Sequence, residues 1–291
     1  MKIVNFGSLN IDFTFLVEQF VQPGQTIDSL NVIRSPGGKG LNQSLAMVRA
    51  GQEVYHAGMI GEDGLFLKEL LEKDGANCRF LKTVDGETGK AFIQVDANGQ
   101  NCIIINGGAN RLNTKAICDE ILNAFQFGDL LLLQNEVANV DYLIERAAEK
   151  GMIVALNPSP LTNALLEGPL DKVSIFILNE DEGMGITGKS EPEAILHEMA
   201  RRYPNAQVIL TLGSKGSVYA HRGERIAQPA FPVSAVDTTG AGDTFTGYLL
   251  ACMAQGLPIQ ECLARASKAS SIAVTRPGAA SSIPYACEVQ L

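Results

Sequence analysis

The sequence predicts a doubly wound α/β sandwich, in which helices cover both faces of a largely parallel sheet. Strand-like and helix-like segments alternate along most of the 291 residues, which is the pattern that such folds require. Residues 129–133 form a continuous apolar run, as expected for a parallel strand that is buried on both faces. Two further regions, at about 12–34 and 88–106, alternate loosely between apolar and polar residues and predict strands outside the βα repeat.

The period of the apolar residues and the positions of the glycines predict the individual strands and helices. Apolar runs predict strands at 2–6, 54–60, 129–133, 152–156, 173–178 and 208–212, and helical spacing predicts helices at 65–73, 140–148 and 194–203. Asn98-Gly99 divides the second outlying region and predicts a hairpin there. Because no repeat or low-complexity linker interrupts the chain, we expect one domain over residues 1–291, with the outlying strands inserted in it.

The composition allows a large core and argues against several classes of function. Hydrophobic residues make up 46% of the chain and charged residues 19%, which suits a sizeable globular domain. The formal net charge of −9 opposes non-specific binding to nucleic acid or to an anionic membrane, since both favour clustered Lys and Arg. We therefore expect small-molecule ligands, and neither a nucleic-acid partner nor a membrane partner.

The cysteines and the first residues of the chain predict a soluble cytoplasmic protein. No CxxC pair and no Cys/His metal spacing is present, and most of the six cysteines lie in apolar segments, as reduced buried thiols do: Cys78, Cys102, Cys118, Cys252, Cys262 and Cys287. The first residues lack a basic segment followed by a long apolar run, and no stretch approaches the length of a membrane span.

A glycine-rich turn that runs into an apolar helix, at Val236–Leu250, is the strongest chemical signal. Gly240 and Gly242 permit close backbone approach, so the amides of residues 240–243 can converge on an anion at the positive end of the helix dipole. Asp243 would stand beside that anion, where a carboxylate can deprotonate a hydroxyl that attacks a phosphate. The alternative is that Asp243 only caps the helix, as carboxylates at such positions often do.

Polar side chains at the ends of two predicted strands form a candidate site for a polyol. Asn10 and Asp12 follow the first strand and share a face in extended chain, where an amide and a carboxylate can bind adjacent hydroxyls. Glu136 follows the strand at 129–133 and projects into the crevice where ligands of such sheets collect. Asn and Asp also favour turns at strand ends, so a purely structural role for Asn10 and Asp12 stays open.

The segment GMGITGKS, residues 183–190, matches both the phosphate-loop pattern and the dinucleotide-binding glycine pattern. Both motifs require the glycines to follow a strand directly, whereas residues 179–182 intervene and place three carboxylates where a phosphate would approach. We therefore interpret the segment as part of a short helix that begins at Asn179 and ends at Gly188. Ser190 and Glu193 are then expected to form a capping box for the next helix.

A second glycine-rich turn, at Ser35–Gly51, also passes into a helix, and together with Val236–Leu250 it resembles the two signature motifs of the PfkB (ribokinase-like) sugar kinase family. The resemblance covers nearly the whole chain and is closest to the ribokinase branch. Other matching segments are SLNID (Ser8–Asp12), LNEDE (Leu178–Glu182), TLGSKG (Thr211–Gly216) and VTRPGAASSIP (Val274–Pro284). The resemblance implies a three-layer α/β/α sandwich with a small β-sheet lid that covers the sugar and mediates homodimerisation.

The resemblance also implies roles for four groups of residues. The catalytic group would be Asp243 as the base, with the backbone of Gly240, Ala241 and Gly242 as the anion hole. The sugar would contact Asn10, Asp12, Gly38, Lys39, Gly40, Asn42 and Glu136. The nucleotide would contact Asn179, Thr211, Leu212, Gly213, Ser214, Lys215, Gly216, Gly242 and Ser267. Potassium would lie near Asp237, Thr239, Ala273, Arg276, Gly278 and Ser282, mostly held by main-chain carbonyls, and Glu182 would act on magnesium indirectly.

The activity that the resemblance implies is transfer of the γ-phosphate of ATP to a primary hydroxyl of a sugar, with Mg²⁺ and K⁺ as cofactors. D-Ribose, giving ribose 5-phosphate, is the leading substrate. Leu41 replaces a residue that is usually small in this family, so fructose, another ketose, a sugar acid and a nucleoside stay open as alternatives. Outside the class, we consider a nicotinamide dehydrogenase and a non-catalytic sugar-binding protein. The glycines within residues 179–190 do not directly follow a strand, as the glycine motif of a nicotinamide dehydrogenase requires. Asp243 argues against a non-catalytic sugar-binding protein, because a protein that only binds sugar has no use for a base beside an anion site.

Overall fold

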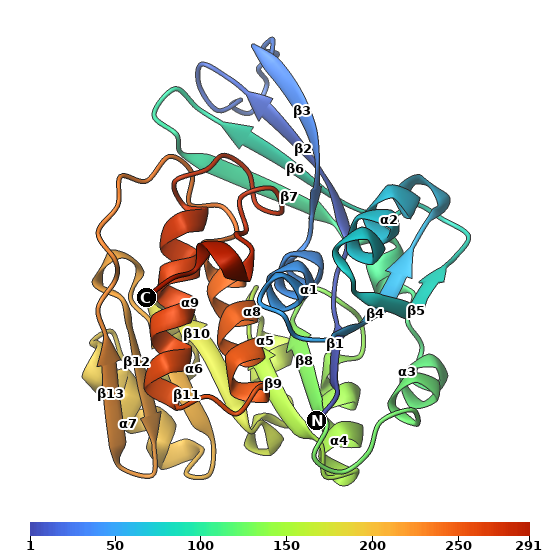
Figure 1. The fold of residues 1–291 in the computed structure, drawn as a ribbon. Coiled ribbons are helices and arrows are strands. Elements are labelled where there is room, and N and C mark those ends of the chain that lie inside the picture. The colour runs from blue at the N-terminus through green and yellow to red at the C-terminus, as the bar shows by residue number, and fades with distance from the viewer.

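The computed structural model describes residues 1–291 and consists of a large sheet between two layers of helices, with a smaller sheet at one end (Figure 1). The large sheet has the strand order β13-β12-β11-β10-β9-β8-β1-β4-β5. Its members are β1 (Ile3–Phe6), β4 (Tyr55–Ile60), β5 (Asn77–Thr83), β8 (Leu130–Gln134), β9 (Ile153–Asn157), β10 (Ile175–Asn179), β11 (Gln207–Thr211), β12 (Ser217–His221) and β13 (Glu224–Gln228). The predicted α/β/α architecture is confirmed.

The large sheet is doubly wound, as predicted. β1 pairs in parallel with β4 on one side and with β8 on the other, so the chain order runs outward in both directions from β1. The antiparallel hairpin of β12 and β13 was not predicted from the sequence. β13 is an edge strand with mostly polar, exposed residues, so it lacks a strong apolar pattern. Its two-residue turn, Arg222-Gly223, has positive φ at both positions, as tight hairpins require.

Four helices cover each face of the large sheet. One face carries α1 (Lys39–Arg49), α2 (Leu65–Asp74), α8 (Ala241–Ala254) and α9 (Ile259–Ala273). The other carries α3 (Lys115–Leu122), α4 (Val140–Glu149), α6 (Glu180–Thr187) and α7 (Pro192–Arg202), with the single turn α5 (Asn163–Leu166) beside them. Short 3-10 turns are η1 (Glu62–Gly64), η2 (Gly108–Arg111), η3 (Leu170–Lys172), η4 (Gly213–Lys215) and η5 (Ala286–Glu288).

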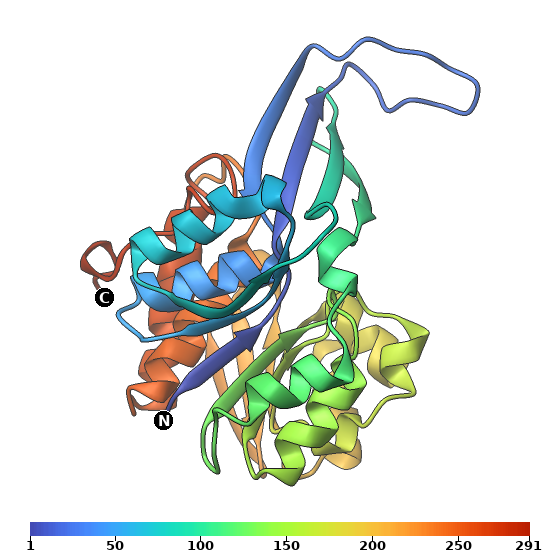
Figure 2. The same cartoon turned by 90° about the vertical axis from the view of Figure 1, so that its right-hand side faces the viewer.

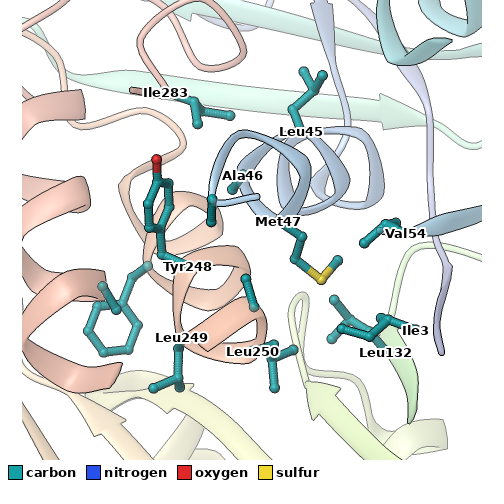
Figure 3. Close-up of a cluster of buried hydrophobic side chains, with 14 of the residues drawn as sticks. Ile3, Leu45, Ala46, Met47, Val54, Leu132, Tyr248, Leu249, Leu250 and Ile283 are labelled. Carbon is teal, nitrogen blue, oxygen red and sulfur yellow. The ribbon is translucent and has the colours of Figure 1, made fainter. Parts of the chain in front are cut away.

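The core on the first face holds α1 and α8 together. Figure 3 shows Met47 of α1 packed toward Ile3 and Leu132, which come from the two central strands. Gly247 of α8 lies directly against Ala46, and a Cβ at residue 247 would overlap the Ala46 Cβ. The two helices that follow the glycine-rich turns therefore pack backbone to backbone, which fixes their amino ends relative to each other.

The smaller sheet has the strand order β3-β2-β6-β7 and stands out from one end of the α/β body (Figure 2). Its strands are β2 (Asn10–Leu16), β3 (Asn31–Gly37), β6 (Gly89–Val95) and β7 (Asn101–Asn106). They lie in the two predicted regions, although β2 begins earlier and β3 ends later, because Asn10 and Gly37 still pair in the ladder. The predicted hairpin is confirmed, with Gly99 at φ 75° in the turn between β6 and β7.

Residues 179–188 form the predicted short helix. Asn179 and Glu182 make a reciprocal capping box at its start, and Gly188 ends it at φ 74°. The predicted capping box of Ser190 and Glu193 is wrong, because α7 starts at Pro192 and no side chain caps it. The helix begins one residue later than that box requires, with Glu191 as its N-cap and proline, which already has the helical φ, as its first residue.

Four of the six cysteines are buried free thiols, as predicted for most of them: Cys78, Cys118, Cys252 and Cys262. Cys102 and Cys287 are exposed, because they lie on the outer strand β7 and in the short turn η5. None of the helices combines the length and apolar character needed to cross a bilayer.

Candidate active site

The carboxyl ends of β1 and β8 meet the amino ends of α1 and α8 at one crevice. β1 leads directly into Gly7, and β8 leads through Gln134 to Glu136. Gly7 and Gly40 lie so close together that a Cβ at residue 40 would overlap the Gly7 backbone. Glycine at both positions therefore lets α1 start over the end of β1. Ligands of doubly wound sheets bind at this place, where the strand order reverses.

Asp243 is buried in the first turn of α8. Gly240, at φ 74°, turns the chain into the helix. The Asp243 carboxylate accepts from Gln43 Nε2 at 2.8 Å and from Asn42 Nδ2 at 3.0 Å. Both donors belong to α1, so Asp243 connects two helices and does not cap its own. The simple capping role is not observed.

Two more carboxyl groups, the buried Glu136 and the half-buried Asp12, face the same crevice. Glu136 accepts from the backbone nitrogen of Lys39 at 3.2 Å and from the Ser8 hydroxyl. Burial raises the pKa of Glu136, although Lys39 and Ser8 act against that rise. Burial, followed by the charges of Glu136 and Asp243, raises the pKa of Asp12 to about 7. Asp12 Oδ1 is buried without a hydrogen-bond partner in the protein, which suits a hydroxyl donor from a ligand.

Lys39 supplies the positive charge among these acids. It is the first residue of α1 and follows Gly38, whose φ of 97° only glycine adopts easily. Burial alone would lower the pKa of Lys39, but the charges of Asp243, Glu136 and Glu182 outweigh it and raise that pKa. Lys39 is therefore protonated at neutral pH and offsets part of the negative charge in the crevice.

Asn10 has a partner that the sequence did not indicate. Asn110 donates to Asn10 Oδ1 at 2.8 Å and exchanges two hydrogen bonds of 3.1 Å with the backbone of Leu9. This bond occupies the amide oxygen of Asn10, so the Asn10 amino group is the part that can donate to a ligand. Asn110 lies in η2, in a loop without hydrophobic period, and a lone Asn in a loop carries no sequence signal.

A pocket of about 440 Å³ lies beside the start of α8. It gathers most of the predicted nucleotide residues from distant parts of the chain: Thr211, Gly213, Ser214, Gly216, Gly242 and Ser267. Leu212 and Lys215 do not line it, although they lie in the same turn after β11. Asn179 does not line it either, since its side-chain oxygen accepts from the Glu182 backbone.

The sequence did not predict one wall of this pocket. Residues 230–235, an irregular segment between β13 and α8, contribute Phe231 and Val233 to the lining. The Lys268 ammonium of α9 lies 5.0 Å from the centre of the Phe231 ring and ties the segment to that helix. The segment has no helical or strand period, so its role depends on tertiary structure alone.

The residues predicted to surround potassium lie at the junction of two loops. Asp237 accepts from the backbone nitrogens of Thr239 at 2.9 Å and Gly278 at 2.8 Å. Burial alone would raise the pKa of Asp237, but these hydrogen bonds lower it, so the carboxylate is ionised. The Ala273 carbonyl accepts from the backbone of Arg276.

Two side chains near this junction have partners of their own. The Arg276 guanidinium pairs with Glu288 at 2.5 Å and makes no ion pair with Asp237. The Ser282 hydroxyl donates to the Ala279 carbonyl at 2.8 Å. The Asp237 carboxylate makes no ion pair with Arg276 or with any other Lys or Arg.

Glu182 lies behind the crevice as part of the cap of α6. One of its carboxylate oxygens accepts from the Asn179 backbone nitrogen at 3.0 Å. Burial raises the pKa of Glu182, while that hydrogen bond and the charge of Lys39 act against the rise. The indirect action of Glu182 on magnesium stays a prediction.

Comparison with known proteins gives the family of the chain. A family model described as pfkB family carbohydrate kinase matches residues 1–286. The ribokinase of Haemophilus influenzae is 33% identical over 96% of this chain and 94% of its own length. The bifunctional ribokinase/ribose-5-phosphate isomerase A of Fructilactobacillus sanfranciscensis is 36% identical over 97% of this chain, which spans only 54% of that protein. The structure of Arabidopsis thaliana ribokinase complexed with ribose and ATP superposes with a TM-score of 0.85, at 32% identity, over 99% of this chain and 97% of that one.

Proposed function

Because the chain belongs to the pfkB family of carbohydrate kinases, we propose that it transfers the γ-phosphate of ATP to the primary hydroxyl of D-ribose, giving ribose 5-phosphate. The relatives named ribokinase and the neighbour that holds ribose and ATP support this substrate pair. The observation that carries the proposal is the position of Asp243. It lies between the crevice with the free oxygen of Asp12 and the pocket that includes Gly242.

On the sugar side, this chain supplies acceptors and donors for hydroxyl groups. Asp12 presents a buried oxygen that has no partner, and Asn10 presents its amino group. Glu136 is held by Ser8 and Lys39 through one oxygen, which leaves the other for a hydroxyl. These side chains would hold the sugar with its primary hydroxyl directed toward Asp243. Holding the reacting groups in one orientation lowers the activation barrier of phosphoryl transfer.

On the phosphate side, Asp243 takes the proton of the attacking hydroxyl. The backbone amides of Gly240 and Gly242, at the positive end of α8, would donate to the transferring phosphate. The Ala241 amide already donates to the Thr238 carbonyl at 3.2 Å. Such donors stabilise charge that develops in the transition state, and each is worth about 3 kcal/mol in comparable anion holes. Lys39, protonated in the crevice, adds a further positive charge.

Two metal ions are part of the proposal. Bound Mg²⁺ would neutralise charge on the phosphates of ATP, and Glu182 would hold it through water or through its free oxygen. Potassium would lie near Asp237, whose ionised carboxylate has no Lys or Arg partner. Main-chain carbonyls and a carboxylate are hard oxygen ligands, which suit this cation.

The small sheet is proposed to cover the sugar and to form a homodimer. Its outer strand β7 is exposed along its whole length and carries Ile103, Ile104 and Ile105. Leu30 and Ile104 are 68% and 67% exposed. The small sheet cannot bury these apolar side chains by itself. We therefore expect a second copy of the chain to pack against them.

The proposal is tested by ADP release with ATP, Mg²⁺ and K⁺, for wild type and for Asp243→Asn. The variant should bind ribose normally and turn over about 10²- to 10⁴-fold more slowly, the usual loss when a general base is removed. Ribose is compared with deoxyribose, fructose, tagatose, 2-keto-3-deoxygluconate, adenosine and pseudouridine. Another substrate that exceeds ribose about tenfold in kcat/KM would replace it as the substrate and leave the kinase activity in place.

A further inference from the structure

A continuous set of buried side-chain amides leads from the central strands to Asp243. Gln134 of β8 donates through Nε2 to Gln43 Oε1 at 2.6 Å and to Asn5 Oδ1 at 3.0 Å. Gln43 of α1 donates through Nε2 to Asp243 Oδ1 at 2.8 Å and to Asn157 Oδ1 at 3.0 Å. Gln43 and Gln134 are completely buried, so these hydrogen bonds do not compete with water.

A backbone carbonyl decides which way Gln43 points. Asn157, at the end of β9, donates through Nδ2 to the Ile177 carbonyl at 3.1 Å. Because a carbonyl only accepts, the side-chain oxygen of Asn157 must face Gln43. Gln43 therefore presents its amino group, whose two hydrogens reach Asn157 and Asp243.

The hydrogen bonds of Asn5 and Gln134, at the other end of this set of amides, orient the Gln43 side chain in the same way. Asn5 donates through Nδ2 to the Gly40 carbonyl and to the Ser44 hydroxyl, each at 2.8 Å, so its oxygen faces Gln134. Gln134 then presents its amino group both to Asn5 and to the Gln43 oxygen. Two independent anchors thus turn the donor side of Gln43 toward Asp243.

We infer that Gln43 is a positioning residue that orients the Asp243 carboxylate for proton abstraction, an inference that rests on the proposed role of Asp243 as the base. Asn42 holds the second oxygen at 3.0 Å. With both oxygens held from α1, the carboxylate keeps one plane and directs its free lone pairs to a constant point in the crevice.

The first experiment compares Gln43→Met with Gln134→Met. Both changes remove a fully buried amide of the same size from the same set, but only Gln43 contacts Asp243. Both should lower the melting temperature by a similar amount. Gln43→Met should lower kcat about 10- to 100-fold, the loss expected when a reacting group is misplaced, while the ribose Kd from calorimetry stays near the wild-type value. Gln134→Met should lower kcat less.

The second experiment repeats Gln43→Met in the Asp243→Asn background. If Gln43 acts through the Asp243 carboxylate, its replacement causes little further loss of kcat once that carboxylate is gone. Equal kcat losses in the two methionine variants, or an undiminished loss in the Asp243→Asn background, would overturn the inference. If Gln43→Met does not fold, Gln43→Leu compared with Gln134→Leu also removes the two buried amides and allows the same comparisons.

The same experiments distinguish a failure of the inference about Gln43 from a failure of the proposed function. Near-normal turnover of Asp243→Asn would reject Asp243 as the base and with it the inference about Gln43, whereas the absence of ADP release by the wild type with ribose and the other sugars would reject the proposed function. A large loss in Asp243→Asn, combined with normal kcat in Gln43→Met, would keep the base and reject Gln43 as its positioning residue.

Discussion

The Asp12 carboxylate fills the space that a side chain at residue 37 would need. Asp12 lies on β2 and Gly37 at the end of the neighbouring strand β3, and a Cβ at residue 37 would overlap the carboxylate. Asp12 is thereby held with Oδ1 buried and free of partners. The absence of a side chain at Gly37 thus shapes the part of the crevice proposed to bind ribose.

Gly37→Ala is expected to displace the Asp12 carboxylate. The KM for ribose should rise about tenfold, which corresponds to about 1.4 kcal/mol, and the KM for ATP should change little. Steady-state kinetics with each substrate varied in turn measure both values. Asn31→Ala, an exposed position at the other end of β3, is the control. An unchanged ribose KM in Gly37→Ala would mean that Asp12 does not bind the sugar.

Asp12 also predicts how stability depends on pH. Its folded-state pKa is raised by burial and by neighbouring carboxylates to about 7, above its ordinary value of 3.8. Between these values the folded protein binds a proton that the unfolded chain has lost, so wild-type stability should fall as pH rises from 4 to 7. Asp12→Asn removes this contribution. The variant should match wild type near pH 4 and exceed it by a few kcal/mol at pH 8.

Urea unfolding of both proteins at a series of pH values measures this difference. Glu120→Gln, which changes an exposed carboxylate paired with Lys82, controls for the loss of one negative charge. A constant stability difference between Asp12→Asn and wild type across pH 4 to 8 would show that Asp12 ionises as an ordinary carboxyl group.

Local patterns predicted the architecture and the ends of some helices, such as α6, but not the start of α7, and they did not predict contacts between distant residues. The glycines around residues 38 and 240 act through their own backbone, so their motifs are visible in the sequence. Gln43 follows a predicted motif residue directly, yet its contact with Asp243 depends on the packing of α1 against α8. Asn110 and Phe231 lie in irregular segments, and only the folded chain brings them to the crevice and the pocket.

Lys189 tests the interpretation of the segment GMGITGKS. Lys189 is exposed after Gly188, where α6 has already ended, and it does not line the nucleotide pocket. Lys189→Ala should therefore leave the ATP KM nearly unchanged. Lys215→Ala is a matched comparison, since this exposed lysine lies in η4 next to pocket residues. A large loss of ATP affinity in Lys189→Ala would restore the phosphate-loop interpretation.

The proposed dimer is tested by placing a charge on the exposed face of the small sheet. Ile104→Asp puts a carboxylate in the middle of β7, where desolvation of that charge would oppose association. Light scattering at micromolar concentration should show a dimer for wild type and a monomer for the variant. Phe127→Asp is the control, because Phe127 is 83% exposed but lies outside the small sheet. A monomeric wild type would contradict the proposal.

The last prediction concerns the cation near Asp237. Asp237 organises the junction by accepting from Thr239 and Gly278, and no basic side chain neutralises it. If potassium balances this charge, replacing it with sodium at constant ionic strength should lower kcat/KM for ATP by at least about threefold, or about 0.7 kcal/mol. Asp237→Asn keeps an acceptor for one of the two backbone amides and loses the charge, so the two salts should give more similar rates in this variant. Choline chloride supplies the ionic strength without a cation that fits the site. Equal wild-type rates in potassium and in sodium would remove a potassium-selective site from the proposal, whereas a sodium effect that persists unchanged in Asp237→Asn would place the cation elsewhere.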